Sequence, residues 1–127
     1  MTDEKFIELA RLIDDRTTSG AMKWEETGVD SLFQATLSKF VIRIKASQSN
    51  FADEIDYEIS IMGRNGTMLE SFSDMELSRI LKNHPNAVEK NGYILMDHIF
   101  KNAKRTALGI DKAIDDVLKE LNDLPPF

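Results

Sequence analysis

The sequence contains no cysteine, which excludes disulfides, thiol nucleophiles and thiolate metal sites. Long apolar runs are also missing. The longest are three or four residues, such as 93–96, whereas a membrane-spanning helix needs about 20. Residues 1–5 lack the basic start and the apolar stretch of a secretion signal. We therefore expect no membrane association and a cytoplasmic location.

Basic residues are outnumbered, with 16 Lys and Arg against 22 Asp and Glu, for a net charge of −6. Proteins that bind nucleic acid through its phosphates usually carry a basic footprint, so this balance argues against a nucleic-acid partner. The 42% of hydrophobic and 30% of charged residues are typical of a soluble globular chain. A length of 127 residues fits one domain, and we expect a single α+β domain over 1–127.

Catalytic and metal-binding motifs are absent from the sequence. The two histidines, His84 and His98, belong to no H-x-x-x-H or H-E-x-x-H pattern. There is no glycine-rich phosphate loop and no G-x-S-x-G elbow. Adjacent carboxylates such as Asp14-Asp15 and Asp53-Glu54 diverge on a helix or a strand. We predict no catalytic residue, cofactor or metal; an enzyme would need a cleft joining a histidine to a distant carboxylate or serine.

Helices are predicted at both ends of the chain. Apolar residues at three- and four-residue steps predict a helix over about 3–19, with Thr2 as its cap and Gly20 at its end. A short helix capped by Ser73 or Asp74 precedes the helix breaker at 84–86. A long helical stretch follows, over about 93–121. Its apolar stripe comprises Leu95, Ile99, Ala103, Thr106, Ile110, Ala113, Ile114, Val117 and Leu121.

Between these helices, apolar and polar residues alternate with the period of strands. The alternation predicts an antiparallel meander of four or five strands, one face of which is covered by the N-terminal helix and the long C-terminal helix. The expected strands are 22–27, 31–37, 40–45, 55–62 and 67–72. The tight turn 64–66 joins the last two strands, because Asn65 and Gly66 tolerate positive φ.

The alternation also predicts which residues pair. A two-residue loop at Ser38-Lys39 places residue 35 opposite 42 and residue 33 opposite 44, so that apolar residues face each other. For the next hairpin we place Ile44 opposite Tyr57. That register sets Arg43 against Glu58 and Lys45 against Asp56, so that opposite charges meet.

Gly109 interrupts the long helical stretch, and it marks a kink, a close contact or a boundary between two helices. If the helix is continuous, a basic face surrounds Leu108 and is formed by Lys101, Lys104, Arg105 and Lys112. Such a face is a candidate interface for an acidic partner, an anion or nucleic acid; the alternative is a solvated helix face with Leu108 buried by a bend. Trp24, the single tryptophan, is either an interface anchor or the closure of one end of the core.

Several segments resemble a loose group of small bacterial proteins of unknown function. The likeness lies in Trp24-Glu25-Glu26-Thr27, Phe33-Gln34-Ala35, the strand at 40–44, and the stretch from Ala107 to Ala113. It spans most of the chain. It implies a bacterial or phage setting and no activity or ligand.

Two functions are consistent with these features. The first is a non-enzymatic interaction or regulatory module that self-associates or binds a protein partner, for example an acidic inhibitor of a basic target. The second is a small-molecule sensor or carrier with a pocket between sheet and helices, which we expect to be lined by Phe33, Phe40, Tyr57 and Ile99.

Overall fold

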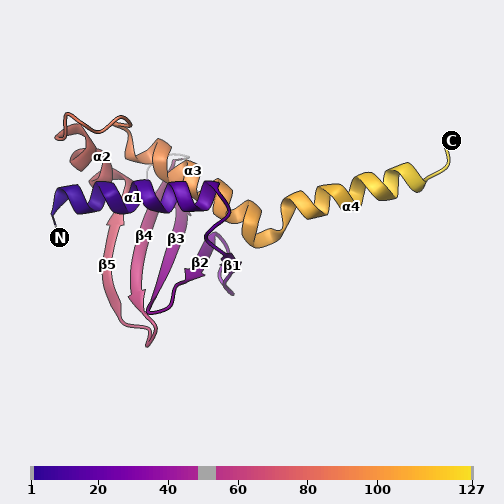
Figure 1. The fold of residues 1–127 in the computed structure, drawn as a ribbon, viewed down its shortest axis with the longest axis horizontal. Helices are drawn as coiled ribbons and strands as arrows, with labels where there is room; N and C mark the ends of the chain where they lie inside the picture. The colour runs from indigo at the N-terminus through magenta and orange to yellow at the C-terminus, as the bar shows by residue number, and fades with distance from the viewer. Residues whose placement is uncertain (1, 49–53, 127) are drawn as a thin grey trace.

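The computed structural model describes residues 2–48 and 54–126, so Asp53 of the adjacent carboxylates lies outside the described residues. Within these residues, four helices and the five strands of one sheet follow one another (Figure 1). The elements are α1 (Asp3–Thr18), β1 (Trp24–Glu26), β2 (Leu32–Thr36), β3 (Phe40–Gln48), β4 (Ile55–Gly63), β5 (Met68–Ser73), α2 (Asp74–Lys82), α3 (Gly92–Leu108) and α4 (Ile110–Asp123).

The first helices begin at the predicted caps. The Thr2 side chain accepts a hydrogen bond from the Lys5 N–H, and α1 then runs to Thr18. Ser73 and Glu76 form a capping box at the start of α2, in which each side chain accepts from the other residue's backbone N–H. These bonds satisfy N–H groups that have no partner inside the helix.

The sheet has the order β1-β2-β3-β4-β5 with every pair antiparallel, which confirms the predicted meander. The first hairpin register is also confirmed, because Phe33 lies opposite Ile44 and Ala35 opposite Ile42. The predicted register of the second hairpin is wrong by two residues. Ile44 lies opposite Ile59 and not Tyr57, and Lys45 lies opposite Glu58. A shift of two residues keeps the same side chains on the same face, so alternation alone could not distinguish the two registers.

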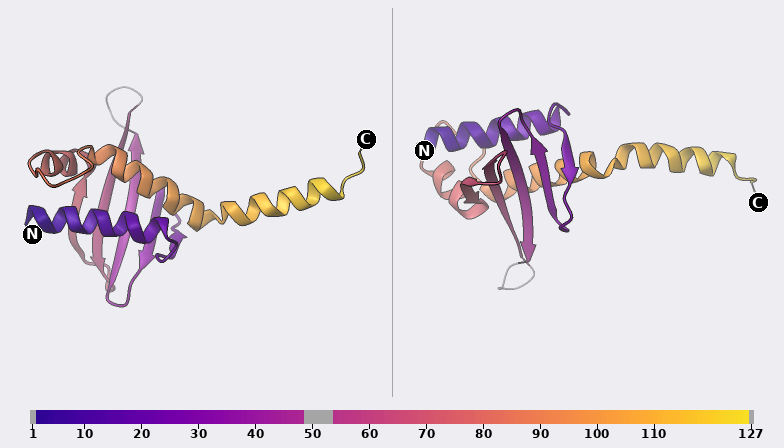
Figure 2. Two further views of the ribbon diagram at one scale, coloured as in Figure 1. Left: turned by 45° about the horizontal axis from the view of Figure 1, so that its top comes forward. Right: turned by 90° about the horizontal axis from the view of Figure 1, so that it is seen from below.

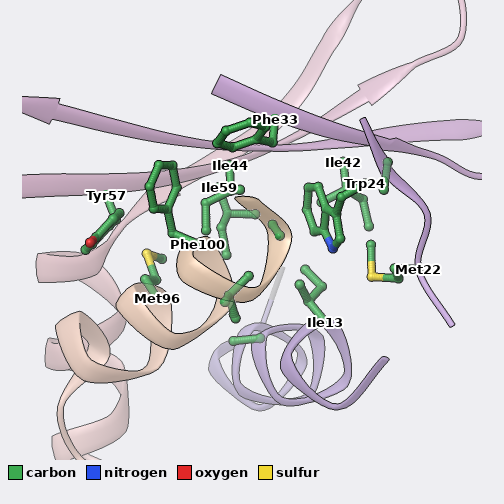
Figure 3. Packing of buried hydrophobic residues seen from close by; sticks show 14 of the residues in the cluster. Ile13, Met22, Trp24, Phe33, Ile42, Ile44, Tyr57, Ile59, Met96 and Phe100 are labelled. Atoms are coloured by element: carbon green, nitrogen blue, oxygen red, sulfur yellow. The ribbon is translucent and has the colours of Figure 1, made fainter. Parts of the chain in front are cut away.

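Helices α1 and α3 lie side by side on one face of the sheet and enclose the core with it (Figure 3). Aromatic side chains connect the two helices to the sheet. Phe100 on α3 packs against Phe33 and Tyr57, with ring centroids 5.5 and 5.4 Å apart, and Phe6 on α1 meets Phe72 edge-on at 5.2 Å. On the opposite face of the sheet, the Arg43 Nε donates to the Gln34 side chain at 3.1 Å.

Helices α2 and α3 approach each other most closely at Gly92. A Cβ placed on Gly92 would lie 2.5 Å from the Asp74 carbonyl oxygen and 2.6 Å from the Ser78 backbone nitrogen. The Gly92 N–H in turn donates to the Ser78 Oγ at 2.8 Å. Only a residue without a side chain fits between the two helices here.

The long C-terminal helix is two helices. Gly109 ends α3 in the left-handed conformation, with φ 61° and ψ 39°, and its N–H bonds to the carbonyls of the preceding turn. Of the alternatives for Gly109, the boundary between helices is therefore the correct one. Helix α3 covers the sheet as expected, whereas α4 extends away from it beyond β1 (Figures 1 and 2). None of the described helices is long and apolar enough to cross a membrane.

Candidate interaction surface

Helix α4 has no buried residue. Within the described part of the chain, it contacts no helix or strand other than α3, from which it continues. Its apolar residues are nevertheless spaced like those of a helix that packs against another surface. Its large apolar side chains are 48–62% exposed from Ile114 to Leu124. We call the following set the α4 face: Ile110, Ala113, Ile114, Val117, Leu118, Leu121 and Leu124.

The spacing of the α4 face is that of a coiled-coil seam. Steps of four and three residues alternate from residue 110 through 114, 117 and 121 to 124, which is the a/d pattern of a heptad. Ala113 and Leu118 widen the seam on its two sides. A free helix of 14 residues is marginal in water, since most helical stability comes from packing of an apolar face. Helix α4 therefore needs a covering surface that the described residues do not supply.

Charge is distributed unevenly across Gly109. The last turns of α3 carry Lys101, Lys104 and Arg105 with no acidic residue between them. Helix α4 is acidic, with Lys112 and Lys119 against the carboxylates of Asp111, Asp115, Asp116, Glu120 and Asp123. The junction thus separates a basic segment from an acidic one.

The predicted basic face is exposed, but ion pairs neutralise much of it. Lys101 pairs with Asp97 at 2.9 Å, Lys112 pairs with Asp116 at 3.1 Å, and Arg105 pairs with Asp111. Lys104 has no ion-pair partner among residues 2–48 and 54–126. Of the four basic side chains in the predicted face, Lys104 is therefore the one whose charge is not neutralised by an ion pair within the described residues.

Leu108 remains 42% exposed, so the bend at Gly109 does not bury it. Together with Lys104 it borders a hollow of about 470 Å³ between the end of α3 and the loop that joins β1 to β2. Val29 and Phe33 also line this hollow, as do the carboxylates of Glu26 and Asp30. A hollow with both polar and apolar lining thus lies directly beside the point where α4 leaves the body of the domain, residues 2–108.

Trp24 belongs to the core and not to a surface, since only 3% of it is exposed (Figure 3). Its Nε1–H donates to the Thr17 Oγ1 at 2.9 Å, which satisfies the indole between β1 and α1. Of the two roles predicted for Trp24, closure of the core is the one that its burial supports.

The pocket expected between sheet and helices has little room. Phe33, Tyr57 and Ile99 are core residues, and Phe100 packs between the first two. Phe40 is 43% exposed at the far end of β3. The carrier function stays a prediction that these contacts do not support.

Both histidines contact carboxylates of α1. The His98 Nδ1 lies 2.6 Å from the Asp14 Oδ1, and the His84 Nε2 lies 3.7 Å from the Asp3 Oδ2. Within the described ranges, no serine or threonine hydroxyl bonds to either ring, and no group of three potential ligands could hold a metal ion. These contacts tie α1 to α3 and to the end of α2.

One polar cluster links the sheet to α3. The Tyr57 hydroxyl donates to Asp97 Oδ1 at 2.5 Å, and Lys101 pairs with the other carboxylate oxygen. Burial raises the pKa of Tyr57, and its bond to Asp97 raises it further. Burial also raises the pKa of Asp97, but the hydrogen bonds from Tyr57 and Lys101 outweigh it and hold that pKa below the ordinary 3.8. The carboxylate is therefore ionised and stabilising at neutral pH.

We expect Asp97→Asn to lower the free energy of unfolding by about 1 kcal/mol at neutral pH. Because the folded-state pKa of Asp97 is lowered, its contribution is present above the unfolded pKa and is lost as pH falls through the folded value. The difference between variant and wild type should therefore shrink below about pH 4. Urea unfolding at several pH values measures it, with Asp115→Asn on exposed α4 as the control. A difference that stays constant down to pH 2.5 would show that the charge of Asp97 is not involved.

The sequence hypotheses missed the α4 face, because they assigned its residues to the core stripe of one long helix. The only local signal was Gly109. No protein-family model, curated protein or solved structure matches the chain.

Proposed function

We propose that the protein is a non-enzymatic, cytoplasmic interaction module that self-associates through the α4 face, with a second copy of the chain as the partner. The observation that carries the proposal is a row of large apolar side chains, each about half exposed, on a helix that contacts no described helix or strand other than α3. Exposed apolar surfaces of this kind mark protein interaction sites. The setting implied by the sequence resemblance is bacterial or phage.

A second copy fits this surface for two reasons. The heptad spacing of the α4 face is self-complementary, since an a/d seam packs against another a/d seam. In addition, each chain carries both a basic segment at the end of α3 and an acidic α4, so a pair of chains can supply both signs of charge to one interface. Symmetric dimers are the commonest assembly of soluble proteins.

Leu121→Asp tests this proposal. Leu121 is one of the seam residues and makes no contact that holds the body, so the variant should fold with an unchanged melting temperature. We expect the wild type to sediment as a dimer and the variant to dimerise at least about 100-fold more weakly, because a carboxylate would be buried without a partner. Dilution of the wild type into monomers should also reduce its helical circular dichroism.

Val88→Asp provides the matched control. Val88 is fully exposed in the loop before α3, so the same change of charge and polarity is made away from α4 and the dimer should persist. Two results would contradict the proposal. One is a wild-type chain that stays monomeric at millimolar concentration, and the other is a Leu121→Asp chain that dimerises as strongly as the wild type.

A further inference from the structure

We infer that the two α4 helices pair antiparallel, so that Leu124 of each copy reaches the hollow beside Leu108 of the other. This inference rests on the self-association proposed above and specifies its geometry. It depends on three features of the described residues: the direction of α4, the charges on either side of Gly109, and the hollow at the end of α3.

The length of α4 sets which residues meet. Full overlap of two antiparallel copies of the helix Ile110–Asp123 places residue 123 of one copy beside residue 110 of the other. Leu124 then lies beside Gly109, one residue from Leu108. The bodies would be separated by the length of α4, about 21 Å at 1.5 Å per residue. In a parallel pair, residues 2–108 of both copies would instead lie at the same end of the paired helices and would overlap in space.

Charge favours the same direction. In the antiparallel pair Asp123 of one copy lies beside residue 110 of the other, six residues or about 9 Å along the helix from Lys104, which a lysine side chain can largely span. Lys104 has no ion-pair partner among the described residues of its own chain. A parallel pair would place Glu120 and Asp123 against the same carboxylates of the second copy, which is unfavourable. The antiparallel arrangement also sets opposite ends of the helix dipoles together.

The hollow offers a site of mixed polar and apolar lining for the end of the arriving helix. Val29, Phe33 and Leu108 supply its apolar lining, and Lys104 lies on its border. The segment that reaches it, Leu124-Pro125-Pro126, carries no charged side chain. Its approach therefore does not set a carboxylate against Glu26 and Asp30, which also line the hollow.

The absence of cysteine in the chain allows a direct test by disulfide trapping. Leu108→Cys and Leu124→Cys are made separately, mixed as folded protein and oxidised gently. We expect a disulfide between the two different variants, and little crosslinking of Leu124→Cys with itself. Val88→Cys measures crosslinking by random collision, and adding Leu121→Asp to both variants should abolish the mixed disulfide.

The sedimentation and crosslinking results test the proposed self-association and the antiparallel pairing separately. A dimer by sedimentation in which Leu124→Cys crosslinks with itself would overturn the antiparallel pairing and leave self-association intact. A monomer by sedimentation would overturn both. Charge reversal gives an independent measurement: Lys104→Glu should weaken the dimer about fivefold, and Asp123→Lys in the same chain should restore it. Failure of that restoration, with no mixed disulfide, would contradict the inference.

Discussion

Replacing Gly92 by alanine is expected to lower the free energy of unfolding by about 3 kcal/mol. The new methyl group would lie 2.5 Å from the Asp74 carbonyl oxygen and 2.6 Å from the Ser78 backbone nitrogen. Both are backbone atoms of α2 and cannot rotate away, so the two helices must separate. Separation would also strain the hydrogen bond from the Gly92 N–H to Ser78. Urea unfolding monitored by circular dichroism measures the change.

Gly28→Ala is the control for this substitution. A Cβ at Gly28 meets no heavy atom within 4 Å, so the variant should be as stable as the wild type or more stable by up to about 1 kcal/mol, because alanine restricts the unfolded chain. Equal stability of the Gly92→Ala and Gly28→Ala proteins would show that α2 and α3 are not as close as described.

Phe72→Ala is expected to cost about 4 kcal/mol. Phe72 on β5 is 1% exposed and packs edge-on against Phe6 of α1. Its removal would leave a cavity between sheet and helix and also lose the aromatic pair. For a domain of this size the melting temperature should fall by well over 10 °C.

Phe40→Ala makes the same chemical change on the same sheet at a side chain that is 43% exposed. Its cost should be about 2 kcal/mol, roughly half that of Phe72→Ala, since nearly half of the Phe40 surface is already exposed. A similar cost for the two phenylalanine variants would contradict the placement of the core between the sheet and α1.

The elements and their order could be predicted from the sequence, because periodicity and caps are local properties. Thr2 and Ser73 begin their helices as predicted, and the loop at Ser38-Lys39 sets the β2–β3 register. The β3–β4 register could not be predicted. The sequence between Gln48 and Ile55 contains no recognisable two-residue turn signal, and a two-residue shift leaves the inward and outward faces unchanged.

The candidate surface was harder to predict for a related reason. Ile114, Val117 and Leu121 have the spacing of a core-facing stripe, and the same spacing describes a helix that packs against another chain. The bend at Gly109 decides between a helix that faces the core and a helix that packs against another chain. The direction of this bend depends on the left-handed backbone conformation of Gly109, which the spacing of apolar residues does not predict. Trp24 illustrates the converse: a residue type common in interfaces is buried in the core here, where Thr17 accepts its indole N–H.

The left-handed glycine between α3 and α4 has an evolutionary consequence. Since no side chain from Ile110 to Pro126 is buried in the body, substitutions there should leave the stability of the body unchanged, and under the proposed self-association they would change only what the helix binds. Descendants of this chain could exchange one recognition specificity for another while inheriting the sheet and its covering helices intact.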